Sequence, residues 1–129
     1  MLDHASLGVA DLEIAVAFYD AVLGPLGYTR VWLTKDAAGY GPPGAEDRLA
    51  LKLRTGEARL AAGPGSHLAL TAPSEVAVAA FHAAAVNTGG TSDGPPGPRP
   101  DYGVGYYAAF VRDPDGHALE AVHHGDGVP

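Results

Sequence analysis

The chain has 129 residues, of which 47% are hydrophobic, and it carries a formal net charge of −7. This length suits one compact domain that buries a core without cross-links. The lack of cysteine excludes disulfides, thiolate metal sites and cysteine nucleophiles, and an acidic chain without a basic stretch is a poor partner for nucleic acid or an anionic membrane.

The N-terminal segment does not have the features of a secretory signal peptide. It lacks both a basic region and an apolar stretch. The longest apolar run, Val76 to Phe81, is far too short to span a bilayer. The sequence therefore predicts a cytoplasmic protein that does not contact membranes.

The first half of the chain predicts one helix among several strands. Asp11 is a good N-cap, and the apolar residues that follow it recur at helical spacing. Pro25 and Gly27 place the end of this helix near residue 24. Strands are expected at residues 4–9, 28–34 and 48–54, with a weakly signalled one near 39–41.

The pattern restarts after Gly63-Pro64-Gly65. A helix capped by Ser74 is expected to end near Asn87, because Gly89-Gly90 stops it. Strands are expected at residues 67–72, 91–93, 104–112 and 117–123. The proline-rich segment 94–100 predicts an extended loop, and residues 113–116 predict a tight turn.

The two halves share one order of elements: a strand that begins at a histidine, then a helix, then more strands. His4 and His67 occupy matching positions, 63 residues apart. Each half is too small to bury its sheet alone. The sequence therefore predicts an α+β fold in one domain, residues 1–129, with a first module of about 1–62 and a second of about 66–124.

Three side chains stand out as candidate metal ligands. Alternation along a strand puts His4 and His67 on the face opposite the aliphatic residues that pack on the helices. Glu120 lies among small and apolar residues, where a carboxylate without a partner is costly. Two imidazoles and one carboxylate on one concave face form a facial triad for a divalent metal. The simpler alternatives are satisfied polar histidines and a solvent-facing glutamate on an edge strand.

Several motifs resemble a known superfamily. Asp3-His4, Val9-Ala10-Asp11-Leu12, Ala17-Phe18-Tyr19 and the run from Val22 to Tyr28 resemble the first module of vicinal oxygen chelate proteins, the glyoxalase/bleomycin resistance/extradiol dioxygenase superfamily. The run from Asp113 to Glu120 is similar to the closing hairpin of that family. The resemblance implies paired βαβββ modules that form a curved mixed sheet around a cleft, helices outside, a metal in the cleft and a homodimer.

The resemblance also implies the ligand set. In that family the first strand of each module supplies a histidine, matching His4 and His67, and the last strand supplies a glutamate, matching Glu120. Members like glyoxalase I add a fourth ligand from the last strand of the first module. Residues 49–53 here contain no carboxylate or imidazole, which counts against glyoxalase I. The remaining set of three is that of extradiol dioxygenases and fosfomycin-resistance enzymes.

Residues near the predicted cleft are candidates for contacts with a small substrate. We expect Tyr102, Tyr106 and Arg99 to bind substrate, and Tyr107 to act with Glu120 in catalysis. The alternative is that the tyrosines pack on neighbouring residues and that the arginine is a solvated loop residue.

These observations predict a metal-dependent enzyme. One divalent ion (iron, manganese, nickel, cobalt or zinc) would bind two neighbouring oxygens of the substrate and act as a Lewis acid in a lyase, isomerase or dioxygenase reaction. One alternative is a protein of the bleomycin-resistance type, which sequesters a drug or metabolite without chemistry. Another is a regulatory or structural subunit with a vestigial triad.

Overall fold

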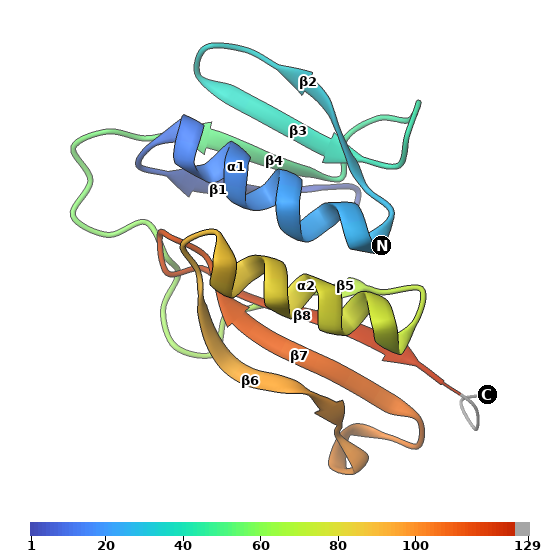
Figure 1. Cartoon of the computed structure of the whole chain (residues 1–129). Coiled ribbons are helices and arrows are strands. Elements are labelled where there is room, and N and C mark those ends of the chain that lie inside the picture. Colours follow the sequence, from blue (N-terminus) through green and yellow to red (C-terminus); the bar gives the residue numbers. More distant parts are fainter. Residues whose placement is uncertain (126–129) are drawn as a thin grey trace.

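A computed structural model describes residues 1–125 as two successive βαβββ units (Figure 1). The first unit contains β1 (Ala5–Val9), α1 (Leu12–Leu23), β2 (Thr29–Leu33), β3 (Ala37–Gly41) and β4 (Leu49–Leu53). The second contains β5 (Leu68–Thr71), α2 (Glu75–Asn87), β6 (Thr91–Pro98), β7 (Tyr106–Arg112) and β8 (Ala118–His124). Short 3₁₀ turns follow α1 at Gly24–Leu26 and β6 at Pro100–Tyr102. The α+β class and the paired units are confirmed.

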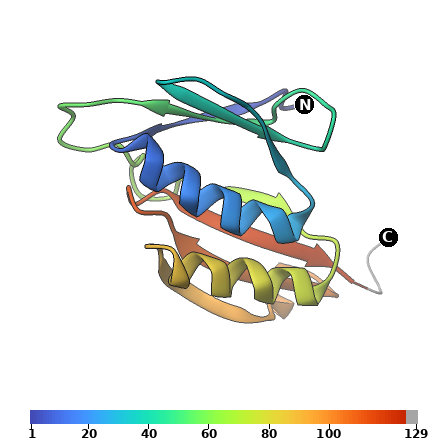
Figure 2. The same ribbon diagram turned by 45° about the horizontal axis from the view of Figure 1, so that its top comes forward.

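The eight strands form two four-stranded sheets of the same topology. Sheet A has the order β1-β4-β3-β2 and sheet B has the order β5-β8-β7-β6. In each sheet the first strand of the unit pairs in parallel with the last, and the other pairings are antiparallel. Helix α1 packs on sheet A, α2 packs on sheet B, and the two helices contact each other (Figures 1 and 2). Each sheet therefore has one face covered by its helix and one face without a helix.

Both helices begin where the sequence predicts them to begin. Asp11 Oδ1 accepts a hydrogen bond from the Ile14 amide at 3.0 Å, and Ser74 Oγ accepts one from the Ala77 amide at 3.1 Å. Within residues 1–125 no helix has both the length and the apolar character needed to cross a bilayer.

The loop predicted at residues 94–100 is wrong for most of its length. Strand β6 continues to Pro98, although its register with β7 shifts between Ser92 and Gly94 and again between Gly94 and Gly97. Proline is tolerated there because β6 lies at the edge of the sheet, where a missing N–H breaks no ladder bond on the solvent side.

The turn between β7 and β8 connects the second unit to the first. Asp113 Oδ2 accepts a hydrogen bond of 2.6 Å from the buried Tyr19 hydroxyl, and Nε2 of His117 donates to the Gly8 carbonyl at 2.7 Å. Burial raises the pKa of the Asp113 carboxyl, and burial next to Asp113 raises the pKa of Tyr19 well above its ordinary value. These bonds fix sheet B relative to β1 and α1.

Candidate functional site

Glu120 is a buried carboxylate in the middle of sheet B. Its strand, β8, lies between β5 and β7, and the residue is only 2% exposed. Its neighbours Leu119 and Ala121 belong to the hydrophobic core, so Glu120 points to the face without a helix. We call this the open face of sheet B and define it by the following side chains: Ala69, Thr71, Tyr106, Ala108, Phe110, Glu120 and Val122. The alternative of a solvent-facing glutamate on an edge strand is wrong.

Two side chains contact the two oxygens of this carboxylate. Nε2 of His67 lies 3.0 Å from Oε1, and the hydroxyl of Tyr106 donates a short hydrogen bond to Oε2. Burial, followed by the bond to Glu120, raises the pKa of Tyr106 to about 12, so its phenol is a protonated donor at neutral pH. The His67 side chain is 49% exposed whereas that of Glu120 is 3% exposed, so the imidazole is the side of the pair that solvent reaches.

The His67–Glu120 pair fits two ligands of one divalent metal. Metal bonds to imidazole nitrogen and carboxylate oxygen are about 2.0–2.2 Å long, which places adjacent ligand atoms about 3 Å apart. The separation of 3.0 Å between Nε2 and Oε1 matches that value. The hydrogen bond from Tyr106 to Oε2 is of the kind that orients a carboxylate. Within residues 1–125, however, no cluster of three His, Cys, Asp or Glu side chains could hold a metal.

His4 is not part of this pair in the single chain. It is exposed just before β1, and its Nδ1–H donates to Asp3 Oδ1 at 2.6 Å. The bond to His4 lowers the pKa of Asp3. The carboxylate can only accept, so this bond leaves Nε2 of His4 with a free lone pair. His4 lines a cavity of about 200 Å³ together with residues of β1 and β5, and neither His67 nor Glu120 lines that cavity.

The other residues expected in the site are divided between two faces. Tyr107 packs against the hydrophobic core, so the structure does not bring it to Glu120. Tyr106 contacts Glu120 directly, and the Tyr102 and Tyr106 rings pack edge to face with their centroids 5.4 Å apart. The guanidinium of Arg99 lies over the Phe110 ring at 5.4 Å.

Three residues near the candidate ligands were not assigned to the site from the sequence. Phe110 is the cross-strand partner of Glu120, and the His124 ring packs 5.1 Å from Tyr106 between centroids. Asp3 holds the His4 ring. Counting outward from the predicted turn at residues 113–116 pairs Phe110 with Leu119, one position away from the observed partner Glu120, so the sequence did not give this contact.

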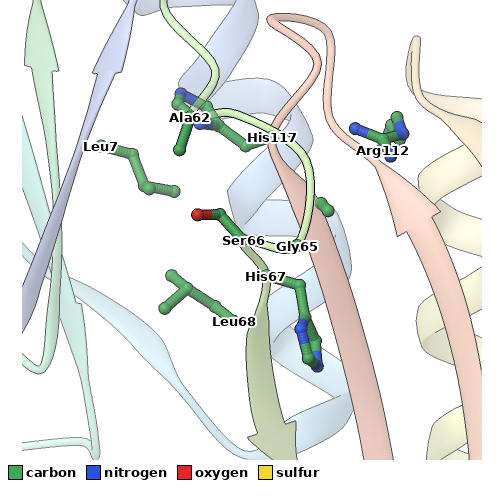
Figure 3. A pocket seen from close by; sticks show the side chains of 9 residues that line it. Leu7, Ala62, Gly65, Ser66, His67, Leu68, Arg112 and His117 are labelled. Atoms are coloured by element: carbon green, nitrogen blue, oxygen red, sulfur yellow. The ribbon is translucent and has the colours of Figure 1, made fainter.

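A cavity of about 330 Å³ opens beside His67 (Figure 3). Leu7 and Leu68 line it, and the Ser66 side chain projects between them, while the His67 imidazole points toward β8 (Figure 3). Its polar lining includes His117 and Arg112. The volume is at the lower end of the range for small-molecule sites.

Comparisons with known proteins show relatives that share this fold. The model of the Glyoxalase/Bleomycin resistance protein/Dioxygenase superfamily matches residues 1–121. A glyoxalase/bleomycin resistance protein from Albidiferax ferrireducens is 36% identical, with a TM-score of 0.77 over 95% of this chain and 97% of the other. A glyoxalase-related enzyme from Fulvimarina pelagi is 26% identical, with a TM-score of 0.69 over 93% and 86%. A glyoxalase I from Zea mays, 24% identical, shares the fold over 94% of this chain and 45% of its own, with a TM-score of 0.68. A search among curated proteins finds no match.

Proposed function

This chain belongs to the glyoxalase/bleomycin resistance protein/dioxygenase superfamily, and from that premise we propose that it is a metal-dependent enzyme acting on a small substrate. One observation carries the proposal: Glu120, a buried carboxylate on the open face of sheet B, has Oε1 3.0 Å from Nε2 of His67. Burying a carboxylate is costly, and a solvent-reachable imidazole beside it is the arrangement that a metal site requires. The reaction is of the lyase, isomerase or dioxygenase type, and the protein acts in the cytoplasm.

The residues of the chain have separate roles in this proposal. His67 and Glu120 would hold the ion, for which iron, manganese, nickel, cobalt and zinc are the candidates. When bound, the ion supplies Lewis-acid stabilisation of negative charge on two neighbouring substrate oxygens. Tyr106 keeps Oε2 of Glu120 hydrogen-bonded, so Oε1 would be the oxygen available to the ion. Tyr107 has no role in this proposal, because its side chain packs against the core on the face of β7 opposite to Glu120.

We further propose that His4 of a second copy completes the site. Two observations support a shared site. His4 is exposed and presents Nε2 outward from its bond to Asp3, as metal-ligating histidines held by a carboxylate do. Ala69 and Thr71 are exposed on the open face of sheet B around the buried Glu120. A two-fold homodimer that lays the start of β1 over this face forms two equal sites.

A mixing experiment tests the metal and the dimer together. We expect His4→Ala and Glu120→Gln to abolish Mn²⁺ binding when each is measured alone. His82→Ala is the control: His82 is a half-buried histidine on α2, and we expect this variant to bind Mn²⁺ as the wild type does. Unfolding and refolding an equal mixture produces half mixed dimers, each with one intact site, so about a quarter of wild-type Mn²⁺ binding returns.

Each outcome of the mixing experiment decides one part of the proposal. Recovery of binding supports a site shared between copies. Loss of Mn²⁺ binding in both variants without recovery on mixing contradicts a site shared between copies but is consistent with a metal site within one chain. Full Mn²⁺ binding by Glu120→Gln contradicts the metal site itself.

A second candidate function is sequestration of a small molecule without chemistry. One observation favours it: within residues 1–125 every buried side-chain nitrogen and oxygen has a hydrogen-bond partner, so Glu120 is satisfied by His67 and Tyr106 alone. This function predicts ligand binding that survives a chelator and is unchanged in His67→Ala. Metal-dependent binding would contradict it.

A further inference from the structure

A fixed positive charge lies on the same face of sheet B as the candidate metal ligands. Phe110 and Glu120 are directly opposed on β7 and β8, so their Cβ atoms are about 5 Å apart on one face. The Arg99 guanidinium lies over the Phe110 ring, 5.4 Å from its centroid. A small molecule bound at the His67–Glu120 pair can therefore also contact Arg99, across the ring of Phe110.

The backbone of its own segment holds the Arg99 side chain. Nη1 donates to the carbonyls of Gly97 and Pro98 at 2.9 and 3.3 Å, and Nη2 donates to Pro95 at 2.7 Å. A guanidinium has five N–H groups, so these three bonds leave two for a ligand. The guanidinium is thus held in one place before any ligand arrives, which lowers the entropic cost of binding.

Two glycines make room for this arrangement. A Cβ atom at Gly94 would lie 3.3 Å from Nη2 of Arg99 and 3.2 Å from Cδ2 of Phe110. A Cβ atom at Gly97 would lie 3.2 Å from Nη1. Any larger residue at either position would crowd the guanidinium. The segment that was predicted to be a loop therefore encloses the side chain of Arg99.

The charge of Arg99 has no carboxylate partner in the part of the chain that the structure describes. Arg112 lies 2.9 Å from Asp93 and Arg30 lies 3.6 Å from Asp20, but within residues 1–125 no acidic group comes within 4.0 Å of Arg99. A guanidinium that is aromatic-stacked, partly buried and without a counter-ion is the arrangement that binds carboxylate or phosphate groups.

We infer that the substrate carries an oxyanion group, a carboxylate or a phosphate-type group, that binds Arg99 while two other oxygens of the same molecule reach the His67–Glu120 site. The second half of this inference rests on the proposed metal-dependent function. The first half, an oxyanion site at Arg99, depends only on the contacts around the guanidinium.

The first test uses metal-free protein, so that it does not depend on the metal. Inorganic phosphate and acetate are titrated separately while the Arg99 Nε–H resonance is followed by NMR, and affinities are compared with those of Arg99→Gln. We expect binding to weaken at least about tenfold in Arg99→Gln, because a hydrogen-bonded charge pair is lost. Arg59→Gln is the matched control, since Arg59 is an exposed arginine whose guanidinium makes one long hydrogen bond within residues 1–125, to the Ala62 carbonyl.

The result of this titration decides whether Arg99 binds an oxyanion. Preference for phosphate over acetate, or the reverse, identifies which oxyanion fits. Equal binding by wild type and Arg99→Gln overturns the site, as does an equal loss in Arg59→Gln. Should Arg99→Gln fail to fold, Arg99→Lys decides instead: it keeps the charge without the planar fork, and we expect a partial loss.

The second test uses Mn²⁺-loaded protein and two chelating probes that differ by one carboxylate, catechol and 3,4-dihydroxybenzoate. We expect wild type to prefer 3,4-dihydroxybenzoate by about tenfold and Arg99→Gln to lose the preference while binding Mn²⁺ normally. Equal affinity of wild type for both probes overturns the link between the two sites. If neither the wild type nor Arg99→Gln binds Mn²⁺, the proposed function is overturned. The phosphate titration still tests the oxyanion site at Arg99 in that case.

Discussion

Nε2 of His67 lies 3.0 Å from Oε1 of Glu120, although 53 positions separate the two residues in the sequence. The parallel pairing of β5 with β8 causes this proximity, because it aligns Leu68 with Leu119 and Ala69 with Glu120. His67 immediately precedes β5, so its ring extends along β8 toward the carboxylate. Strand pairing thus creates one solvent-reachable imidazole against one buried carboxylate, and the functional account depends on this pair.

We predict that Tyr106→Phe weakens Mn²⁺ binding by about 10- to 100-fold, the usual effect of removing the outer partner of a metal ligand. The change removes the hydrogen bond to Oε2 of Glu120 but leaves the ring in place. Titration with Mn²⁺ measures the effect. Tyr107→Phe is the control, because Tyr107 packs on the core side of the same strand. Equal losses in the two variants would contradict the role of Tyr106.

The titration of Tyr106 offers a test in metal-free protein. Its pKa is raised to about 12, so between about pH 10 and 12 the unfolded chain releases this proton while the folded chain keeps it. The contribution of Tyr106 to stability is therefore complete below pH 10 and is lost as the pH rises through about 12. NMR of tyrosine labelled at Cζ follows this residue, and Glu120→Gln should move its pKa toward 10. A pKa unaffected by that substitution would contradict the contact.

The sequence predicted the sheet face on which His67 and Glu120 lie, because the periodicity of strands is a local property. His67 and Glu120 were both placed on the face opposite their aliphatic neighbours, and the structure agrees. The choice between Tyr106 and Tyr107 depended on the register of β7, which the sequence did not reveal. Pairing with β8 decides it, since Tyr106 is the residue that reaches Glu120.

The position of His4 could not be predicted from the sequence. Its face on β1 follows from alternation, but its distance from Glu120 depends on how sheet A is placed relative to sheet B. That placement comes from bonds far apart in sequence, such as Tyr19 with Asp113. The length of β6 could not be predicted for a similar reason. Prolines are tolerated in a strand that lies at an edge, and edge position is a property of the whole sheet.

We predict that Tyr19→Phe destabilises the fold by about 1–3 kcal/mol, because a buried acceptor on Asp113 loses its donor. The hydrogen bond from Tyr19 lowers the pKa of Asp113 against the larger effect of burial, so its loss raises that pKa further. A raised carboxyl pKa means that the folded state holds the proton more tightly, so stability falls as the pH rises from about 3.8 through the raised value.

Urea unfolding of wild type and Tyr19→Phe across this acidic range measures both effects. The decline of stability with rising pH should extend to higher pH in the variant. Tyr28→Phe serves as the control, since its hydroxyl makes no hydrogen bond to a side chain within residues 1–125. An unchanged pH profile with unchanged stability would show that the Tyr19–Asp113 bond does not connect the two units.

We predict that Gly39→Ala displaces the side chain of Trp32, the only tryptophan of the chain. A Cβ atom at residue 39 would lie 2.1 Å from Nε1 of Trp32, so the ring must leave sheet A. Because Trp32 is already 37% exposed, we expect a loss of only about 1 kcal/mol together with a red shift of its fluorescence. Gly24→Ala, where a Cβ atom would contact nothing, is the control. An unshifted spectrum in Gly39→Ala would contradict this packing.

The anomalous scattering of a crystal grown with Mn²⁺ tests the metal site itself. We predict one peak at about 2.0–2.3 Å from both Nε2 of His67 and Oε1 of Glu120, with a histidine from the start of β1 of a second copy as third protein ligand. A saturating concentration of Mn²⁺ that leaves His67 hydrogen-bonded to Glu120, with no peak between them, would contradict it.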